Sequence, residues 1–355
     1  MSARELIRIE QLPVYQNKMF DTVAAALACP RGDVVLVQDP ASGLVANAAF
    51  DPDLLQYDDS YQNEQGHSAV FRSHLDEVLG VLARHFRGAR VLEIGCGKGD
   101  FVDSLRHAGY DARGVDPAYE GDSPYIVKAH FAPALGLTGD AVVMRHVLEH
   151  IPAPRDFLET VREANGGRGL IYIEVPCFDW ILERRAWFDV FYEHVNYFRI
   201  EDFRRLFGRV VEAGHVFGGQ YIYVVADLAS LRDPASAELP VPAALAPPQD
   251  FRGSVERCLA RLRPGQRAVW GAAAKGVMFS HHLRLRGEYL DFAIDINPAK
   301  QGRFLAVSAL PVLAPSAALA QLQPGANIIV MNSNYLDEIQ RAAGPHFNYV
   351  ALDQT

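Results

Sequence analysis

The chain has 355 residues, with 34 Lys and Arg against 43 Asp and Glu, which gives a formal net charge of −9. The length predicts two or three domains, and the lack of any run of Lys and Arg argues against a nucleic-acid partner. The first residues lack an apolar signal core and no stretch approaches a charge-free membrane span, so we expect a cytoplasmic protein with no membrane partner.

The N-terminal region, residues 1–67, predicts a small β-rich lobe, because the alternating run of residues 33–38 leads into a turn-rich stretch. A helix is expected over residues 68–87, where apolar side chains recur at helical spacing. Strand patterns at 91–94, 112–115, 141–144 and 170–174 then alternate with helix patterns at 100–108 and 154–163. This alternation predicts an α/β fold, with a doubly wound, Rossmann-like parallel sheet over residues 68–232.

Residues 233–250 contain five prolines and predict a semi-rigid linker. The α/β pattern then restarts, which predicts a second, smaller α/β domain over residues 251–355. Its expected elements are a helix at 251–263, strands at 267–270, 290–296 and 327–331, a turn at 271–276 that leads into a helix, and a helix at 335–342.

The strand of residues 91–94 runs into a glycine turn, residues 95–99, which is the usual start of a nucleotide-binding sheet. Asp116 follows at about the twenty-residue spacing at which such folds place a carboxylate against ribose hydroxyls. A dinucleotide fingerprint would need Gly at position 100, where Asp100 would repel a pyrophosphate. Glu93 and Asp116 instead favour S-adenosylmethionine, which carries cationic groups and no phosphate. A glycine turn that merely packs is the plainer alternative.

Further segments carry a family resemblance: residues 145–152, residues 191–198, and the turn 271–276 with residues 295–302 and 334–339. In order and spacing they resemble the deoxysugar C-methyltransferases, which join a small N-terminal lobe, a class I methyltransferase core and a C-terminal α/β domain. The resemblance covers nearly the whole chain. It implies transfer of a methyl group from S-adenosylmethionine, leaving S-adenosylhomocysteine, to a carbon next to a ketone on a nucleotide-linked sugar.

The chain departs from that family in two places. The family's N-terminal lobe usually binds zinc through four cysteines, whereas this chain keeps only Cys29 there and has no Cys-x-x-Cys pair, so we expect no metal. The family often has Tyr three residues before the catalytic His, where this chain has Phe191. Either Tyr192 supplies the missing hydroxyl or the substrate differs.

Carried over residue by residue, the resemblance makes His194 the candidate general base, with Glu193, Tyr192 and Tyr197 beside it. Tyr192 or Tyr197 would donate to the oxyanion of an enolate. Glu193 would favour the imidazolium, or would anchor the backbone, because adjacent side chains of an extended segment point to opposite faces. The alternative is an aromatic core segment in which His194 is simply hydrogen-bonded. Its interleaved polar residues are costly to bury, which favours a functional segment.

The residues expected to bind the cofactor are Tyr61, Glu93, Gly95, Cys96, Gly97, Asp116, Pro117, Arg145, His146 and His150. Tyr57 and Tyr61 are interpreted as aromatic lids or as plain surface tyrosines. The residues expected to bind the substrate are Glu174, Asn196 and Lys275. Lys275 would neutralise a diphosphate at a helix N-terminus unless it is only a solvated Lys, and Glu174 would otherwise cap a helix.

Three other functions stay open. An O- or N-methyltransferase would use His194 to deprotonate a hydroxyl or to orient an amine. A nicotinamide-dependent oxidoreductase would use one of the two α/β domains as a dinucleotide site. A non-catalytic binding protein could retain the fold. In each enzyme class the partner is a small molecule.

Overall fold

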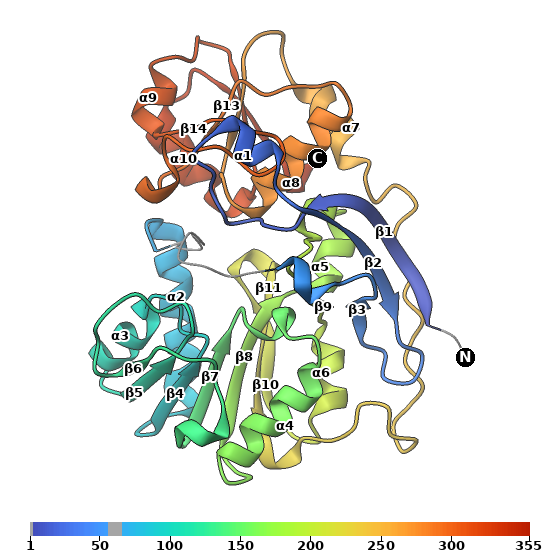
Figure 1. The fold of residues 1–355 in the computed structure, drawn as a ribbon, viewed down its shortest axis with the longest axis vertical. Coiled ribbons are helices and arrows are strands. Elements are labelled where there is room, and N and C mark those ends of the chain that lie inside the picture. Colours follow the sequence, from blue (N-terminus) through green and yellow to red (C-terminus); the bar gives the residue numbers. More distant parts are fainter. Residues whose placement is uncertain (1–2, 56–65) are drawn as a thin grey trace.

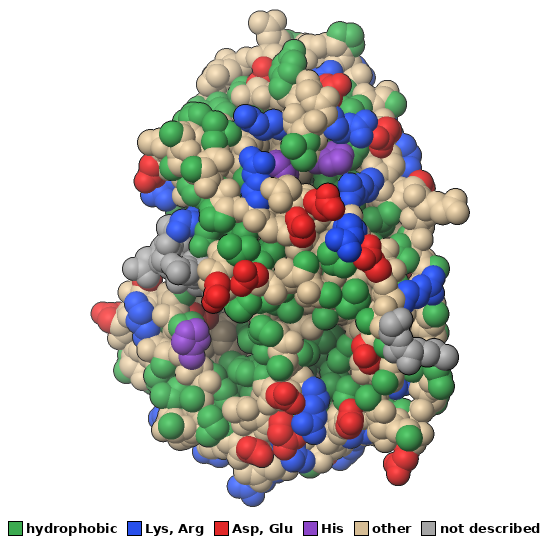
Figure 2. All heavy atoms as spheres, turned by 45° about the vertical axis from the view of Figure 1, so that its right-hand side comes forward, with side chains coloured by type: hydrophobic (Ala, Val, Ile, Leu, Met, Phe, Trp, Pro, Cys, Tyr) green, Lys and Arg blue, Asp and Glu red, His purple; other side chains and the backbone are tan. Residues whose placement is uncertain are grey.

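The computed structural model describes residues 3–55 and 66–355, so the predicted lids Tyr57 and Tyr61 lie outside the described residues. Two α/β units lie one above the other in Figure 1, and a curved antiparallel sheet flanks them. No helix in the described part of the chain is both long and apolar enough to cross a membrane. Lys and Arg side chains are interspersed with Asp and Glu side chains on the face that Figure 2 shows.

The antiparallel sheet joins the N-terminal segment to the candidate catalytic segment. Its order is β1 (Arg4–Pro13), β2 (Arg31–Gln38), β3 (Val45–Asn47) and β9 (Asn196–Tyr197). The N-terminal region is therefore β-rich, as predicted, but residues far along the chain complete its sheet. The short helix α1 (Val23–Leu27), which the sequence analysis did not predict, reaches the C-terminal unit, where the Val307 N–H donates to the Ala26 carbonyl.

The seven-stranded sheet has the order β10-β11-β8-β7-β4-β5-β6. Its strands are β4 (Arg90–Ile94), β5 (Asp111–Val115), β6 (Ile126–Val127), β7 (Ala141–Arg145), β8 (Leu170–Pro176), β10 (Val210–Val216) and β11 (Tyr221–Asp227). All run in the same direction except β11, which is antiparallel to its two neighbours, β8 and β10. Strands β4 and β7 read as apolar runs because both faces of the sheet are covered. This sheet confirms the predicted doubly wound α/β fold.

The helices of this unit are α2 (Ala69–His85), α3 (Asp100–His107), α4 (Pro154–Ala164), α5 (Phe178–Glu183) and α6 (Ile200–Leu206). Helix α2 begins where the sequence predicts, because the Ser68 hydroxyl accepts a hydrogen bond from the Phe71 N–H. Residues 233–250 form no helix or strand. Side-chain hydrogen bonds nevertheless hold this segment against strand β2. The Gln38 side chain donates to the Ala243 carbonyl and accepts from the Leu245 N–H.

The C-terminal unit holds a parallel sheet of order β14-β13-β12-β15-β16. Its strands are β12 (Arg267–Trp270), β13 (Phe292–Ile294), β14 (Val312–Leu313), β15 (Asn327–Val330) and β16 (Asn348–Ala351), and its helices are α7 (Ser254–Arg261), α8 (Ala274–Leu285), α9 (Pro315–Leu319) and α10 (Leu336–Ala343). Helix α8 begins inside the predicted turn 271–276. A Cβ atom at Gly276 would lie 2.0 Å from the Gly271 carbonyl oxygen, so glycine is needed for the helix to pack this close.

Candidate active site

A cavity of about 260 Å³ lies between the carboxyl ends of the two parallel sheets. Its lining comes from the ends of β8, β12 and β15 and from residues that follow β7 and β13. The N-terminal segment contributes Gln16 and Asn17. Because ligands of open α/β sheets bind outside the carboxyl ends of the strands, this cavity is the candidate site for an acceptor.

The glycine turn after β4 lies against the end of β5. Gly95, Gly97 and Gly99 have positive φ values of 75°, 55° and 91°. A Cβ atom at Gly95 would lie 2.2 Å from a methyl group of Val147, so only glycine fits there. The Asp116 carboxylate, which follows β5, accepts a 2.8 Å hydrogen bond from the Gly97 N–H. The structure thus brings these predicted cofactor residues together.

Glu93 lies at the end of β4 and is 2% exposed. Its Oε2 atom has no hydrogen-bond partner among the described residues. Burial raises the pKa of this carboxyl group to about 8. A buried carboxyl group with an unpaired oxygen beside a glycine turn fits a ligand with cationic groups, because a nearby positive charge favours the ionised carboxylate. The residues present therefore fit S-adenosylmethionine.

Three other predicted cofactor residues lie in or near this turn. Cys96 is buried and Pro117 is exposed, directly after Asp116. The Arg145 guanidinium stacks on the Phe101 ring, 4.5 Å from the ring centroid. Arg145 therefore packs beside the first turn of α3, and it does not line the cavity.

Glu174 is fully buried and does not line the cavity, so the structure does not offer it to a substrate. It accepts a 2.7 Å hydrogen bond from the Tyr172 hydroxyl, and ring nitrogens of His74 and His146 each lie 3.1 Å from its Oε1 atom. Burial alone would raise the pKa of Glu174, but the Arg145 charge and the two histidines outweigh burial and hold it well below its usual range. Glu174 therefore anchors these side chains in the core, and the structure does not bring it to the cavity, where a substrate contact is predicted.

His194 does line the cavity, as its predicted role requires. The main chain fixes its position: the Val195 N–H donates to the Glu149 carbonyl over 2.8 Å, and the Asn47 N–H donates to the Val195 carbonyl over 2.7 Å. Burial and the neighbouring His150 hold the pKa of His194 well below its usual value. The imidazole is therefore neutral at pH 7 and has a lone pair available to accept a proton.

The two candidate oxyanion donors lie elsewhere. The Tyr192 hydroxyl accepts a 2.9 Å hydrogen bond from the Asp51 N–H, and the Tyr197 hydroxyl accepts a 3.0 Å hydrogen bond from the Phe191 N–H. Both hydroxyls also donate to the carbonyl of the same residue. Neither tyrosine lines the cavity, because these main-chain bonds hold them in the surrounding core.

Glu193 and Asn196 are also anchors of this segment. The Glu193 carboxylate accepts a 2.8 Å hydrogen bond from the Gln16 N–H, which matches the predicted alternative that it fixes the backbone. The Asn196 amide donates to the Ile151 carbonyl over 2.6 Å. Neither side chain lines the cavity, so the structure does not bring Asn196 to the candidate acceptor site.

His146, Glu149 and His150 follow β7 and line the cavity. The His150 Nδ1 atom lies 2.9 Å from the Glu193 carbonyl oxygen; since a carbonyl only accepts, Nδ1 carries the proton and Nε2 is the basic nitrogen. His146 lies between two carboxylates, with Nδ1 3.3 Å from Glu149 and Nε2 3.1 Å from Glu174. Burial lowers the pKa of His146, but the two carboxylates outweigh burial and raise it to about 9.

Glu149 is a cavity residue that the sequence analysis did not select. It is 1% exposed, and its Oε2 atom has no hydrogen-bond partner in the described part of the chain. The only sequence signal is its place directly before His150 in the segment that follows a strand. A glutamate there reads equally well as a solvated residue, so its burial could not be foreseen.

Lys275 enters the cavity from the first turn of α8. Its Nζ atom lies 2.9 Å from Asp189, and both side chains are largely buried. Nζ also lies 5.1 Å from the centroid of the Trp180 ring. The predicted phosphate-binding Lys therefore reaches the cavity, but Asp189 already compensates its charge.

The family comparisons agree with this architecture. A methyltransferase domain matches residues 63–210, and a C-methyltransferase C-terminal domain matches residues 249–347. The C-methyltransferase NovU of Streptomyces niveus is 26% identical over 288 residues, which cover 71% of this chain and 68% of NovU. The mitochondrial ubiquinone biosynthesis O-methyltransferase of Schizosaccharomyces pombe is 32% identical over 94 residues, which cover 22% of this chain and 34% of that protein.

Two of the similar solved structures each cover less than half of this chain. The PH0226 protein of Pyrococcus horikoshii is 17% identical, covers 46% of this chain and 92% of its own, and has a TM-score of 0.37. The magnesium protoporphyrin IX methyltransferase of Synechocystis, solved with S-adenosylhomocysteine, is 17% identical over 44% of this chain and 82% of its own, with a TM-score of 0.34. The fold, the cofactor residues and the two matched domains identify this chain as an S-adenosylmethionine-dependent methyltransferase that is similar to C-methyltransferases.

Proposed function

We propose that this enzyme methylates a carbon next to a carbonyl group, and that its acceptor is a nucleotide-linked keto-sugar or a similar small carbonyl compound. The observation that carries the proposal is a neutral, buried His194 in the wall of a cavity at the carboxyl ends of two sheets. The name of NovU and the C-methyltransferase C-terminal domain support carbon as the methylated atom.

His194 would make the carbon nucleophilic. Its ring nitrogen would take a proton from the carbon, and the electron pair of the broken C–H bond would move into the carbonyl group to give an enolate. Bound S-adenosylmethionine would supply an electrophilic methyl group to that carbon. The main chain of Val195, the next residue, is hydrogen-bonded both to Glu149 and to Asn47. These bonds would keep His194 in place during this step.

Lys275 is the proposed contact for the negative charge of the acceptor. It reaches the cavity from the C-terminal unit, opposite the segment that follows β7. Asp189 would hold the Lys275 side chain in position until an anionic group arrives. A diphosphate-linked sugar would supply such a group, whereas a neutral carbonyl compound would not.

The test uses His194→Ala with His194→Gln as a second variant. We expect both to lose methyl transfer while the binding of S-adenosylhomocysteine, measured by calorimetry, stays within a few-fold of wild type. Loss of a general base typically costs about 10²–10⁴ in rate. Methyl transfer at the wild-type rate by either variant would refute the base assignment.

A second measurement identifies the methylated atom. Without S-adenosylmethionine, the wild-type enzyme in D₂O should exchange the acidic C–H of an accepted keto-sugar nucleotide, and His194→Ala should not. Product analysis by NMR should place the new methyl group on that carbon. A methyl group on oxygen or nitrogen, with no exchange, would favour the O- or N-methyltransferase alternative.

A further inference from the structure

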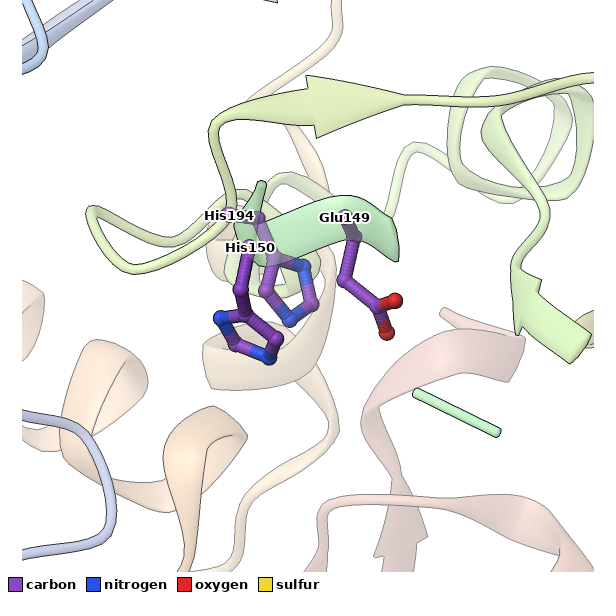
Figure 3. A group of neighbouring side chains, drawn as sticks. All are labelled: Glu149, His150 and His194. Carbon is purple, nitrogen blue, oxygen red and sulfur yellow. The ribbon is translucent and has the colours of Figure 1, made fainter. Parts of the chain in front are cut away.

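Three cavity residues form a cluster of metal-binding type: Glu149, His150 and His194 (Figure 3). One ligand atom of each lies within 4.8 Å of the other two. Two imidazoles and one carboxylate that face an open position are a donor set that suits Zn²⁺ and similar divalent ions. The expectation of no metal rests on the number and spacing of the cysteines, whereas this cluster contains no cysteine.

We propose that Glu149, His150 and His194 bind one Zn²⁺-like divalent ion, and that the loaded enzyme is an inhibited form. The inhibitory part rests on the proposed function, in which His194 is the base. A ring nitrogen that coordinates a metal has no lone pair left for a proton. Metal and substrate proton would therefore compete for the same atom.

The backbone holds the three ligands in one place. Glu149 and His150 belong to a one-turn helix, η3 (Leu148–His150), and the Val195 N–H ties the His194 segment to the Glu149 carbonyl. The side chains project to the same side of the ribbon (Figure 3). The ligands therefore come from two segments that are far apart in the sequence. A main-chain hydrogen bond of 2.8 Å joins these two segments.

The surrounding groups orient the donor atoms as they do in known metal sites. The Glu193 carbonyl accepts from His150 Nδ1, which leaves Nε2 as the metal-facing nitrogen. His146 lies 3.3 Å from one oxygen of Glu149, while the second oxygen has no hydrogen-bond partner among the described residues. Around a tetrahedral Zn²⁺ with bonds of about 2.1 Å, ligand atoms are about 3.4 Å apart. The longest separation allowed by the 4.8 Å limit would have to shorten by about 1.4 Å, and side-chain rotations that do so would complete the coordination.

The nitrogen content of the site selects the ion. Mg²⁺ and Ca²⁺ prefer oxygen ligands, so neither should bind at concentrations where Zn²⁺ does. This cluster therefore suits Zn²⁺ and similar ions better than it suits Mg²⁺.

The test starts from the full-length enzyme stripped with EDTA and titrated with ZnCl₂ by calorimetry. We expect one Zn²⁺ per chain, visible absorption bands when Co²⁺ replaces Zn²⁺, and no binding of MgCl₂. Glu149→Gln and His150→Ala should each weaken Zn²⁺ binding at least tenfold. His215→Ala, an exposed histidine on β10, is the matched control and should bind Zn²⁺ like wild type. Bound S-adenosylhomocysteine, detected by thermal shift, shows that each variant is folded.

Activity separates the two parts of the proposal. With an accepted keto-sugar nucleotide, methyl transfer should fall in proportion to Zn²⁺ occupancy and return after EDTA. Absence of Zn²⁺ binding, or equal binding by Glu149→Gln and His150→Ala, would overturn the site. Zn²⁺ binding without inhibition, or with activation, would overturn the inhibitory role. Lack of carbon methylation by the metal-free enzyme is a different result and would refute the proposed function instead.

Discussion

Replacing Gly95 by Ala tests how tightly the cofactor turn is built into the fold. Gly95 has φ 75°, and a side chain in this left-handed region costs about 1–2 kcal/mol. The new Cβ atom would also lie 2.2 Å from a Val147 methyl group. Because carbon atoms normally approach to about 3.5–4.0 Å, one segment must move by roughly 1.5 Å, and overpacking of this kind costs about 1–3 kcal/mol. The total loss of unfolding free energy is therefore about 2–5 kcal/mol.

Two further variants separate the two contributions. Gly97 also has positive φ, but a Cβ atom there would meet no atom within 4 Å, so Gly97→Ala should lose only about 1–2 kcal/mol. Val147→Ala in the Gly95→Ala background removes the clashing methyl group and should recover about 1–3 kcal/mol of the loss that Gly95→Ala causes. Urea unfolding of all four proteins measures these differences. Equal loss for Gly95→Ala and Gly97→Ala, or no rescue by Val147→Ala, would refute the steric argument.

Three other predictions concern buried charges. The folded-state pKa of Glu93, about 8, lies above its ordinary value of 4.5, so its contribution to stability is complete below pH 4.5 and is lost as pH rises to about 8. In urea unfolding of the cofactor-free enzyme, Glu93→Gln should therefore lose this pH dependence of the unfolding free energy. A pH profile equal to that of wild type would contradict the assignment to Glu93. Glu174→Ala should cost about 3–5 kcal/mol, measured the same way, since it leaves buried partners unpaired; a loss below about 1 kcal/mol would argue against an anchor. Lys275→Ala should destabilise the protein more than the Lys275→Ala/Asp189→Ala double variant does, because the single change leaves a buried carboxylate without its partner. Thermal denaturation measures both stabilities. A double variant less stable than Lys275→Ala would show that Asp189 is not left buried.

Local patterns in the sequence predicted the parallel sheets and the glycine turn well. Strand β4 and the start of α2 were predicted to within a residue because apolar runs and a Ser cap are short-range signals. The start of α8 was predicted too late, since Gly276 reads as a turn residue although the structure uses it for close packing.

The candidate site was harder to predict because it depends on contacts between distant segments. His194 reaches the cavity, whereas Tyr192 and Tyr197 next to it do not. The difference arises from main-chain partners such as Asp51, about 140 residues away, which no local pattern reveals. The burial of Glu149 likewise depends on the loop that carries His194, and the sequence order alone does not place these two together.

The N-terminal segment has a consequence for how the protein is made. It is synthesised before both of its partners, which are strand β9 at residues 196–197 and Phe304, the partner of Phe20. These pairings cannot form until most of the chain has been made, and such non-local contacts form slowly. On the ribosome, the nascent methyltransferase unit would fold around an incomplete cavity. Its last wall, and with it the acceptor site, would be assembled only after synthesis has reached the C-terminal unit.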